Sequence, residues 1–289
     1  MTISVVICTR NRAEQLALAL QSWLQVDFAY PWELIVVDNG STDHTWQIIE
    51  YFREQFGQRL LSITELQKGL GNARDLGSKL AQGEIVVFTD DDCYPDKNFL
   101  EDIKLCFDED PRLGFLGGRV LLFDPTDFPI TIQEQTTREA LNPGSFIPAG
   151  LIQGANFACR KEALDSINGF DGRLGAGTPF PCEDVDTLAR LSAKGWHGAY
   201  DPRPLVYHHH RRKTLQDVKR LLVQYDYGRG AYYVKCLMNP RLRWVYLLRW
   251  LSFIPRQHPQ KTLRELFSGG SYLWQSWQPG RPVQETNRF

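Results

Sequence analysis

Short, almost continuously apolar runs alternate with amphipathic segments along the first ninety residues of the chain. The runs are rich in Val and Ile, as strands buried on both faces of a sheet are. They lie at residues 3–8, 33–37, 60–63 and 84–88. The intervening segments repeat apolar residues at helical spacing, for example Leu16, Leu20 and Trp23. This order predicts an α/β fold with a mostly parallel central sheet and helices on both faces, in which ligands bind beyond the carboxyl ends of the strands.

The second half of the chain has a less regular pattern. The periodicity predicts strands at 113–123, 153–160 and 205–207, and helices at 185–194, 215–237 and 242–253. A proline-containing loop between 124 and 148 is long enough to carry function. Beyond residue 210 only helices are expected.

Composition and charge narrow the class of protein. The chain has 289 residues, and its 35 aromatic residues are too many for intrinsic disorder. Its six Cys are scattered without a CxxC pair, which favours buried free thiols in a reducing cytosol over a disulfide scaffold. Residues 1–202 hold 17 Lys+Arg against 30 Asp+Glu, a net of −13, whereas 203–264 hold 14 basic and two acidic residues, a net of +12. The basic part is therefore expected to face something anionic, either nucleic acid or a lipid surface.

Polar side chains follow the first two expected strands at the points where they end. Thr9 and Asn11 come directly after the first strand, and Asp38 follows the second. Parallel neighbouring strands would bring these groups to one edge of the sheet. Asn, Asp and Ser are also common in turns and helix caps, so the segment at 38–43 has a purely structural alternative. No GxGxxG follows the first strand, which disfavours a dinucleotide-binding loop.

The triplet Asp90-Asp91-Asp92 follows the fourth expected strand and is the sharpest local signal in the sequence. Three adjacent carboxylates repel one another unless water or a cation offsets the repulsion. Mg²⁺ and Mn²⁺ are commonly held by carboxylates together with substrate phosphates. On an extended strand end, Asp90 and Asp92 would point one way and Asp91 the other. A solvated acidic turn before Pro95 is the alternative.

Three further segments carry side chains suited to chemistry. Arg74 lies near the start of an expected helix, where it could meet a phosphate or form a surface ion pair. Glu183 and Asp184 begin another helix after a Gly- and Pro-rich loop, a position suited to a general base and also to ordinary helix-dipole stabilisation. His208 and His210 would share a face after the last strand as ligands of a transition ion, unless they only begin the basic patch that continues through 211–213.

Taken together, these segments resemble the family 2 glycosyltransferases, which have a GT-A type nucleotide-sugar-binding fold. The matching segments occur in the family's order over residues 1–210. They are SVVICTRNR (4–12), VVDNGSTD (36–43), GNARDLGS (71–78), TDDDC (89–93), GANFACRKEAL (154–164), GFD (169–171), CEDVD (182–186) and VYHHH (206–210). The resemblance implies a GT-A type catalytic domain over 1–210, followed by a helical, basic and aromatic C-terminal extension over 211–289.

The resemblance also implies roles on the donor side of a site. Thr9 and Asp38 would hold the nucleobase, Arg74 would approach the ribose or diphosphate, Asp90 would bind the ribose, and 154–156 would line the sugar and acceptor pocket. The residues expected to bind the nucleotide sugar are Thr9, Asn11, Asp38, Arg74, Asp90, Asp91, Gly154 and Asn156.

The remaining implied roles concern metal and catalysis. Asp92 and His208, with His210 as a second choice, would hold Mn²⁺ or Mg²⁺. Asp184 would be the catalytic base, and Glu183 would orient the acceptor beside it. The expected activity is inverting, metal-dependent transfer of a sugar from a nucleotide-diphosphate donor, UDP-sugar favoured, to a glycan or lipid-linked acceptor. The alternatives are a non-catalytic nucleotide-sugar or glycan-binding protein and a sugar-1-phosphate nucleotidyltransferase.

The basic C-terminal part has two open interpretations. Segment 215–256 interleaves arginines with large apolar residues, which suits a helix lying on an anionic membrane surface. Those residues are Trp244, Tyr246, Leu247, Trp250 and Phe253. The same residues could instead pack a helix across the catalytic domain. We expect no nucleic-acid partner, no membrane-spanning segment, and a cytoplasmic location, with the inner face of the cell membrane as the alternative.

Overall fold

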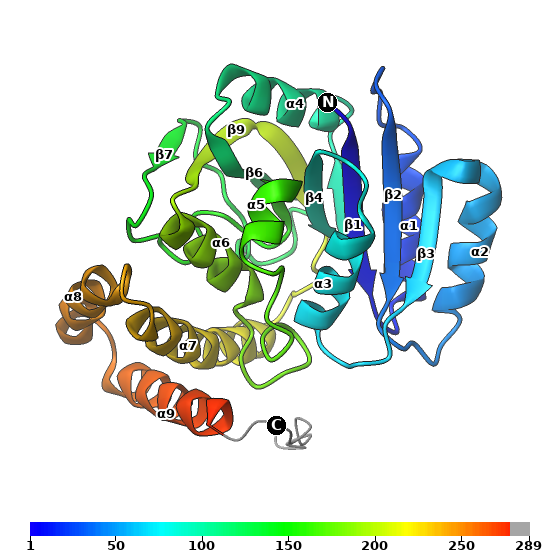
Figure 1. Ribbon diagram of the computed structural model, residues 1–289. Coiled ribbons are helices and arrows are strands. Elements are labelled where there is room, and N and C mark those ends of the chain that lie inside the picture. Colours follow the sequence, from blue (N-terminus) through cyan, green and yellow to red (C-terminus); the bar gives the residue numbers. More distant parts are fainter. Residues whose placement is uncertain (278–289) are drawn as a thin grey trace.

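A computed structural model describes residues 1–277, and the strands in this range form one sheet of nine (Figure 1). The strand order is β3-β2-β1-β4-β8-β6-β9-β5, with β7 paired to β9. The strands are β1 Ile3–Thr9, β2 Trp32–Asp38, β3 Leu60–Thr64, β4 Ile85–Asp90, β5 Cys93–Pro95, β6 Leu113–Leu122, β7 Glu139–Leu141, β8 Asn156–Arg160 and β9 His197–His208.

Helices cover both faces of this sheet and continue beyond it. They are α1 Ala13–Trp23, α2 Thr45–Phe56, α3 Leu70–Leu80, α4 Phe99–Glu109, α5 Lys161–Ser166, α6 Glu183–Lys194, α7 Leu215–Met238, α8 Arg243–Phe253 and α9 Pro259–Ser276, with 3-10 turns at Gly57–Arg59 and Ile254–Arg256. The α/β class and the C-terminal helical extension expected from the sequence are confirmed. The extension was expected to reach residue 289, and its last part, 278–289, lies outside the described residues.

The alternation of side chains along the strands builds the two core layers. In β1, Ile3, Val5 and Ile7 are buried in one core with α1, α2 and α4. Val6 is buried in a second core with residues of α3, α5 and α6. Because successive side chains of a strand point to opposite faces, one apolar run supplies both layers.

Strand direction and register bring distant segments to one edge. β1 runs parallel to both β2 and β4, with Thr9 opposite Asp38 and Cys8 opposite Asp90. At the other end of the sheet β5 pairs antiparallel to β9, with Cys93 opposite His208. The residues following β1, β2 and β4 therefore meet at one edge of the sheet, and β5 carries the end of the acidic motif to the end of β9.

Several elements differ from the sequence expectation. α4, α5, β5 and β7 were not expected, and β7 lies within the segment 124–148 that was expected to be a loop. Proline and glycine explain two further differences. β9 covers twelve residues where only 205–207 was expected, since Pro202 and Pro204 interrupt its pattern and coincide with a register shift against β6. α9 was not expected at all. It begins at Pro259, a good first-turn residue, but contains Gly269 and Gly270, which weaken the helical signal.

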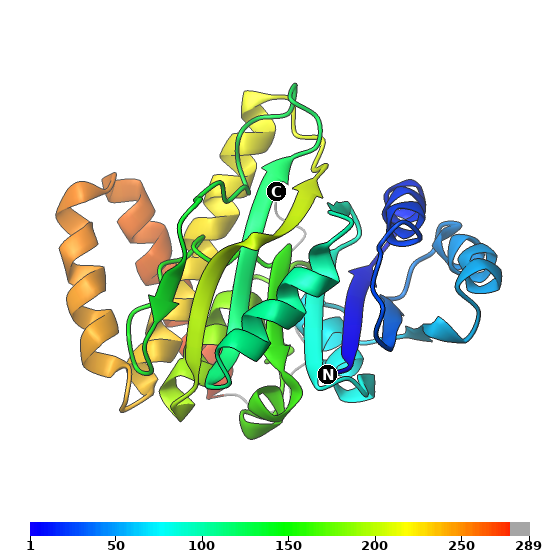
Figure 2. The same cartoon turned by 90° about the horizontal axis from the view of Figure 1, so that it is seen from above.

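The C-terminal helices pack on the rest of the chain through a third apolar core. Ala231 and Tyr232 of α7 lie in this core with Val185 of α6, and Tyr246 and Trp250 of α8 are buried there too. α8 and α9 lie at the opposite end of the molecule from α1 and α2 (Figures 1 and 2). No helix among residues 1–277 is both long and apolar enough to cross a bilayer.

Candidate functional site

The ends of β1, β2 and β4 place the expected nucleotide-binding residues together. The Thr9 hydroxyl donates to Oδ2 of Asp91 at 2.6 Å, which joins the end of β1 to the acidic motif. Asp38 Oδ1 accepts the backbone N–H of Ser41 at 3.0 Å. Within residues 1–277 no hydrogen bond reaches Asp38 Oδ2, so this atom is available to accept from a ligand.

Asn11 connects two turns at this edge. Its φ of 52° lies in the left-handed region, which Asn tolerates better than most residues. The Asn11 N–H donates to Ser41 Oγ at 2.8 Å, and Asn11 Oδ1 accepts the N–H of Thr42 at 2.7 Å. These contacts fix the turn after β1 against the turn after β2.

Arg74 is the central cation of the site and is only 2% exposed. Its Nη1 donates to Glu183 Oε1, and its Nη2 donates to Asp90 Oδ1 and to the carbonyl of Gly154, each at 2.9 Å. Although burial works against its charged form, the carboxylates of Glu183, Asp90 and Asp184 hold the pKa of Arg74 above its usual range. A surface pairing of Arg74 is therefore excluded, because this guanidinium joins α3, β4 and the start of α6.

Glu183 and Asp184 begin α6 but have different surroundings. Burial raises the pKa of the Glu183 carboxyl to about 7, against the opposing effect of Arg74. Burial also raises the pKa of Asp184, which is less buried than Glu183 and accepts the N–H of Val185 on Oδ1 at 2.7 Å. No residue in the described part of the chain donates a hydrogen bond to Asp184 Oδ2.

Because Gly154 has no side chain, the Asp184 carboxylate and the Arg74 guanidinium can lie close to its backbone. A Cβ at position 154 would lie 2.9 Å from Asp184 Oδ2 and 3.2 Å from Arg74 Nη1. Since a side chain here would displace the carboxylate or the guanidinium, the absence of one keeps the space beside Asp184 Oδ2 free.

The three carboxylates of the acidic motif have different partners. Asp91 accepts the Thr9 hydroxyl, and its Oδ1 lies 2.8 Å from Nε of Arg12 in an ion pair. Asp90 and Asp92 each bring a carboxylate oxygen close to His208 at the end of β9. Arg12 also contacts Asp92 through Nη2, and Arg12 was not singled out in the sequence although it stands in the strand-end segment.

Asp90, Asp92, Cys93 and His208 form a potential metal centre. One ligand atom from each lies within 4.8 Å of the others. His208 Nε2 lies 3.3 Å from Asp92 Oδ1, and Nδ1 lies 3.1 Å from the carbonyl of Thr131. A proton on Nδ1 donated to that carbonyl leaves the Nε2 lone pair directed at the centre.

His210 and Asn156 lie outside the potential metal centre. The second-choice ligand His210 is not part of the group, because its Nδ1 accepts the N–H of Arg212 at 3.0 Å and its Nε2 donates to the carbonyl of Phe128 at 3.1 Å. Asn156 is 1% exposed, and its amide donates to the carbonyls of Arg119 and Pro204 at 2.9 and 3.0 Å. The Asn156 amide therefore ties β6 to β9, apart from the Arg74 cluster.

Cys93 is a member of the potential centre that the sequence reasoning did not select. Burial raises the pKa of its thiol well above the usual range, so the sulfur carries its proton and is a weak ligand for a hard cation. Its position directly after the Asp triplet was the only signal in the sequence. The oxygen and nitrogen donors of Asp90, Asp92 and His208 remain suited to Mn²⁺ or Mg²⁺.

GT-A type glycosyltransferases have a mixed sheet, with acidic and basic side chains gathered at the ends of strands such as β1, β2 and β4. The chain has this fold. The model of the family "Glycosyl transferase family 2" matches residues 4–167, more than half of the chain. The chain belongs to this family.

Relatives with known names cover this chain to different extents. The poly(ribitol-phosphate) beta-N-acetylglucosaminyltransferase TarS of Staphylococcus aureus is 34% identical over 110 residues, which are 38% of this chain and 19% of TarS. Glycosyltransferase AglE of Haloferax volcanii is 25% identical over 260 residues, covering 88% of this chain and 82% of AglE. The pre-mycofactocin glycosyltransferase of Mycobacterium tuberculosis is 28% identical over 283 residues, 94% of this chain and 51% of that protein.

Solved structures share the fold at low sequence identity. The mannosyltransferase PcManGT from Pyrobaculum calidifontis, in complex with GDP-Man and Mn²⁺, has a TM-score of 0.65 at 19% identity over 96% of this chain and 76% of its own. TarS residues 1–349 in complex with UDP-GlcNAc have a TM-score of 0.64 at 20% identity over 94% of this chain and 81% of theirs. At these identities the likeness establishes the fold alone.

Proposed function

We propose that this enzyme transfers a sugar from a nucleoside-diphosphate donor to a hydroxyl of a glycan or lipid-linked acceptor, with inversion at the anomeric carbon. The observation that carries the proposal is the convergence of Arg74 with Asp90, Glu183 and Gly154 beside Asp184. A UDP-sugar is the favoured donor, because TarS structures of similar fold were solved with UDP-GlcNAc and with UDP. PcManGT was solved with GDP-Man, so a GDP-sugar is the donor to test beside it.

The donor half of the site is the edge formed by β1, β2 and β4. Asp38 Oδ2 can accept from the imide N–H of a uracil or guanine base, since Oδ1 is held by Ser41. Thr9 and Asn11 hold the surrounding turns in place. Asp90 is the most exposed carboxylate of its triplet and can accept from ribose hydroxyls.

Asp92 and His208 are the residues that would hold a divalent ion at this edge, with Asp90 beside them. Mn²⁺ or Mg²⁺ bound there would neutralise charge on the departing diphosphate. Asp92 is suited to this role as an ionised carboxylate, because Arg12 and a protonated His208 outweigh the effect of burial and hold its pKa below the usual range. His208 Nε2 would hold a bound metal in place of that proton. Thr131 orients His208 for the same purpose through the contact to Nδ1.

Asp184 is the proposed general base. Its Oδ2 lies beside Gly154 and accepts no hydrogen bond from the described residues, and burial raises the pKa of its carboxyl toward the range in which a base works well near neutral pH. The acceptor hydroxyl would lose its proton to Oδ2 as its oxygen attacks the anomeric carbon. Glu183 stays bound to Arg74 and positions that cation. No second carboxylate beside Asp184 is free for a covalent intermediate among the described residues, which favours a single inverting displacement.

A thermal-shift titration with UDP-, GDP- and dTDP-sugars, each with Mn²⁺, Mg²⁺ or EDTA, tests the donor and the metal. A ligand at 100 times its dissociation constant stabilises by about 2.7 kcal/mol, a shift of several degrees. We expect one nucleotide class to stabilise the protein only with a metal, and D92N to lose the metal effect. The matched control is D108N, which removes an exposed carboxylate paired with Lys104 on α4. Stabilisation by every nucleotide sugar without regard to metal would contradict the metal site.

The base is tested with D184N. This variant keeps the volume of the side chain, so donor binding should remain within a few-fold of wild type while turnover falls at least 100-fold. NMR of the product then gives the anomeric configuration, and retention would overturn the inverting mechanism. Near-normal turnover of D184N would remove Asp184 from the mechanism. Formation of a nucleotide sugar and pyrophosphate from a sugar 1-phosphate and a nucleoside triphosphate would favour the nucleotidyltransferase alternative instead.

We also propose that α8 and α9 rest on an anionic membrane surface, through a face that differs from the one expected. Tyr246 and Trp250 are buried, whereas a continuous set of large apolar side chains is exposed on both helices. The exposed set is Trp244, Leu248, Leu251, Leu263, Leu266, Phe267 and Trp274. Trp244, Leu248 and Leu251 recur at helical spacing among Arg241, Arg243 and Arg249, and the exposed apolar residues of α9 begin beside Lys261 and Arg264. Basic residues bordering an apolar helical face are the pattern of an interfacial helix.

Flotation with vesicles of phosphatidylglycerol and phosphatidylcholine tests this surface. Wild type should float with the anionic vesicles, and the double variant W244S/F267S should not. W46S is the control, since Trp46 is a partly exposed tryptophan on α2 at the other end of the molecule. Failure of wild type to float would end the membrane interpretation, as would a concentration-dependent dimer that W244S/F267S abolishes.

A further inference from the structure

The loop at 171–182 connects the GFD motif to the start of α6, and none of its residues has a role in the proposed mechanism. Within this range the structure has neither a helix nor a strand. Its glycine and proline residues are Gly172, Gly175, Gly177, Pro179 and Pro181. A Cβ at Gly175 would lie 3.1 Å from Glu183 Oε2, so the loop touches the residue beside the proposed base. Because glycine-rich backbone has many accessible conformations, the groups that hold this loop also determine where the base lies.

The start of α3 holds one part of the loop through backbone hydrogen bonds. The N–H of Leu70 donates to the carbonyl of Ala176 at 2.9 Å, and the N–H of Gly71 donates to the carbonyl of Leu174 at 3.2 Å. α3 also carries Arg74. The loop therefore lies against the helix of the central cation before it enters the helix of the base.

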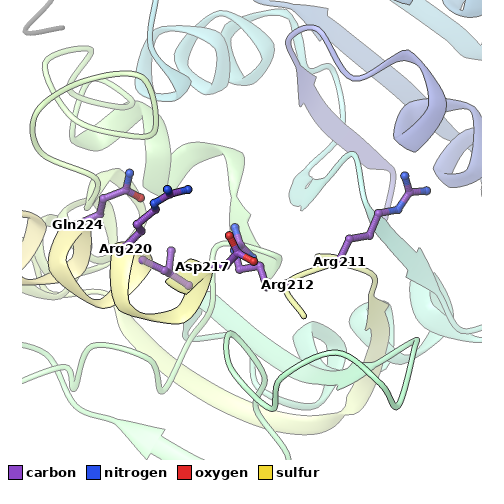
Figure 3. Close-up of a pocket in the computed structure, with 6 residues that line it drawn as sticks. Arg211, Arg212, Asp217, Arg220 and Gln224 are labelled. Carbon is purple, nitrogen blue, oxygen red and sulfur yellow. The ribbon is translucent and has the colours of Figure 1, made fainter. Parts of the chain in front are cut away.

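Helix α7 passes from a basic pocket to the same loop. Its first turns line, together with Arg211 and Arg212, the pocket of about 300 Å³ shown in Figure 3. Further along, α7 lies directly on the loop, since a Cβ at Gly228 would be 2.2 Å from the carbonyl oxygen of Pro181. Lys235 follows about two helical turns later, so it lies on the same face of α7.

Lys235 connects the first residue of the loop to the first turn of α6. Its ammonium group lies 2.7 Å from Asp171 Oδ2 and 2.9 Å from Asp186 Oδ1. Asp186 is 1% exposed and stands two residues after Asp184. Although burial favours the neutral amine, the carboxylates of Asp186 and Asp171 hold the pKa of Lys235 above its usual range. The side chain therefore stays a cation and ties the two ends of the loop together.

Tyr272 of α9 adds a second contact at the start of the loop. Its hydroxyl accepts Nη2 of Arg173 at 3.0 Å and donates to Asp171 Oδ2 at 3.4 Å. Its ring lies edge-on to Phe180, with 5.6 Å between the ring centroids. The C-terminal helices thus contact both the beginning and the end of the loop.

We propose that Lys235 is a positioning residue for sugar transfer: by holding Asp171 and Asp186 together, it fixes the first turn of α6 and with it the Asp184 carboxylate. This inference rests on the proposed function, because it takes Asp184 as the base. Without the ammonium group the ends of the loop separate and the first turn of α6 can move. A displacement of about 1 Å at a reacting group can lower turnover about 100-fold.

Three variants change the Lys235 contact in different ways. K235M removes the ammonium group and keeps most of the side-chain volume. This variant should fold, because Arg173 still pairs with Asp171 and Arg190 still pairs with Asp186. K235R is the conservative variant that keeps the charge. D171N removes the opposite charge and keeps the volume of that side chain.

Hydrogen exchange measures the order of the loop without any substrate. Amides of residues 172–186 should exchange at least tenfold faster in K235M and D171N than in wild type, whereas K235R should stay within threefold. R229M is the matched control, because Arg229 joins α7 to α9 through Glu265 and none of its ion pairs reaches the loop. R229M should leave exchange in 172–186 within twofold of wild type. Unchanged exchange in K235M would overturn the inference.

Turnover is followed as release of the nucleoside diphosphate from UDP-GlcNAc, GDP-mannose or dTDP-glucose, with water as the acceptor, and is expressed per nucleotide-binding site. K235M should lower kcat at least tenfold and leave KM within threefold, because the donor binds at the ends of β1, β2 and β4. K235R should restore at least a third of wild-type kcat, and R229M should keep it within twofold. If K235M only reduces the number of nucleotide-binding sites and kcat per site stays normal, Lys235 is purely structural and the inference is wrong.

A double variant separates this inference from the proposed function. In a D184N background K235M should lower turnover less than twofold, since Lys235 has no base left to position. A further tenfold loss in that background would show that Lys235 acts independently of Asp184 and would refute the inference alone. Near-normal turnover of D184N by itself would refute the proposed function and this inference with it.

Discussion

Replacing Arg74 with Met should cost more stability than any surface change in α3. Arg74 is 2% exposed and makes three contacts of 2.9 Å, two of them to the carboxylates of Glu183 and Asp90. Met fills much of the same volume but leaves those acceptors without a donor. The variant thus isolates the loss of charge and hydrogen bonds from the loss of packing.

The expected magnitude follows from the burial of the partners. Removing one member of a buried ion pair costs about 3–5 kcal/mol, because the remaining charge is uncompensated. At about 2–4 °C per kcal/mol for a chain of this size class, Tm should fall by roughly 10 °C. R74K should lie between Met and wild type, since one ammonium cannot satisfy a carboxylate on each side and a carbonyl.

The loss should also depend on pH in a defined direction. Burial already raises the pKa of Glu183, and Arg74 is the main group opposing that rise. Without Arg74 the folded protein retains the Glu183 proton that the unfolded chain releases. The folded state then binds more protons than the unfolded state over this range, so stability falls as pH rises. R74M should therefore recover part of its loss when the pH is lowered from 8 to 5.5.

Urea and thermal unfolding of wild type, R74M and K79A at both pH values measure this prediction. Lys79 lies on the same helix in an exposed pair with Asp75, so K79A should change stability by less than about 0.5 kcal/mol. If R74M loses no more than K79A, or if its loss grows at low pH, the buried cluster does not contribute to stability as argued.

Three further predictions concern positions where space or charge is tightly defined. G154A should reduce turnover at least tenfold in a steady-state assay, because its Cβ would lie 2.9 Å from Asp184 Oδ2. G270A is the control. Its Cβ would have no atom within 4 Å, so it should stabilise α9 by about 0.5–1 kcal/mol and leave turnover unchanged. The free energy of unfolding of wild type should fall as pH rises from about 4.5 to the raised Glu183 pKa of about 7, and E183Q should reduce this fall. Urea unfolding at several pH values in this range measures the difference. An unchanged pH dependence in E183Q would assign the fall to another group. G228A should destabilise the protein by several degrees in Tm, since its Cβ would lie 2.2 Å from a carbonyl oxygen of the loop before α6, and an unaltered Tm would show that α7 can shift away.

Much of the candidate site was predictable, because polar residues that directly follow an apolar run mark the end of a strand in a parallel sheet. Asp90 and Asp92 were expected to share a side, and both contribute to the potential metal centre. The alternation rule for strands is local and needs no knowledge of partners. For Arg74 the sequence left open a phosphate contact and a surface ion pair, and only its contacts with Glu183 and Gly154 assign it to the interior.

The histidine segment marks a limit of that local reasoning. His208 and His210 are equivalent by spacing, yet only His208 faces Asp92. His210 is occupied on both ring nitrogens by backbone groups of Phe128 and Arg212. Phe128 lies 82 residues away in the chain, so no local pattern could separate the two histidines.

The sequence by itself determined the α/β class, the family, and the strand-end residues that meet at one edge, because these depend on apolar periodicity and on motifs a few residues long. The tertiary structure alone decided which charged groups are buried together and which apolar face of the C-terminal helices remains exposed. Tyr246 and Trp250 illustrate the difference, since both looked suited to a surface and both are buried against α7. Helical spacing shows that an amphipathic face exists, whereas the side that is covered depends on contacts between segments far apart in the chain.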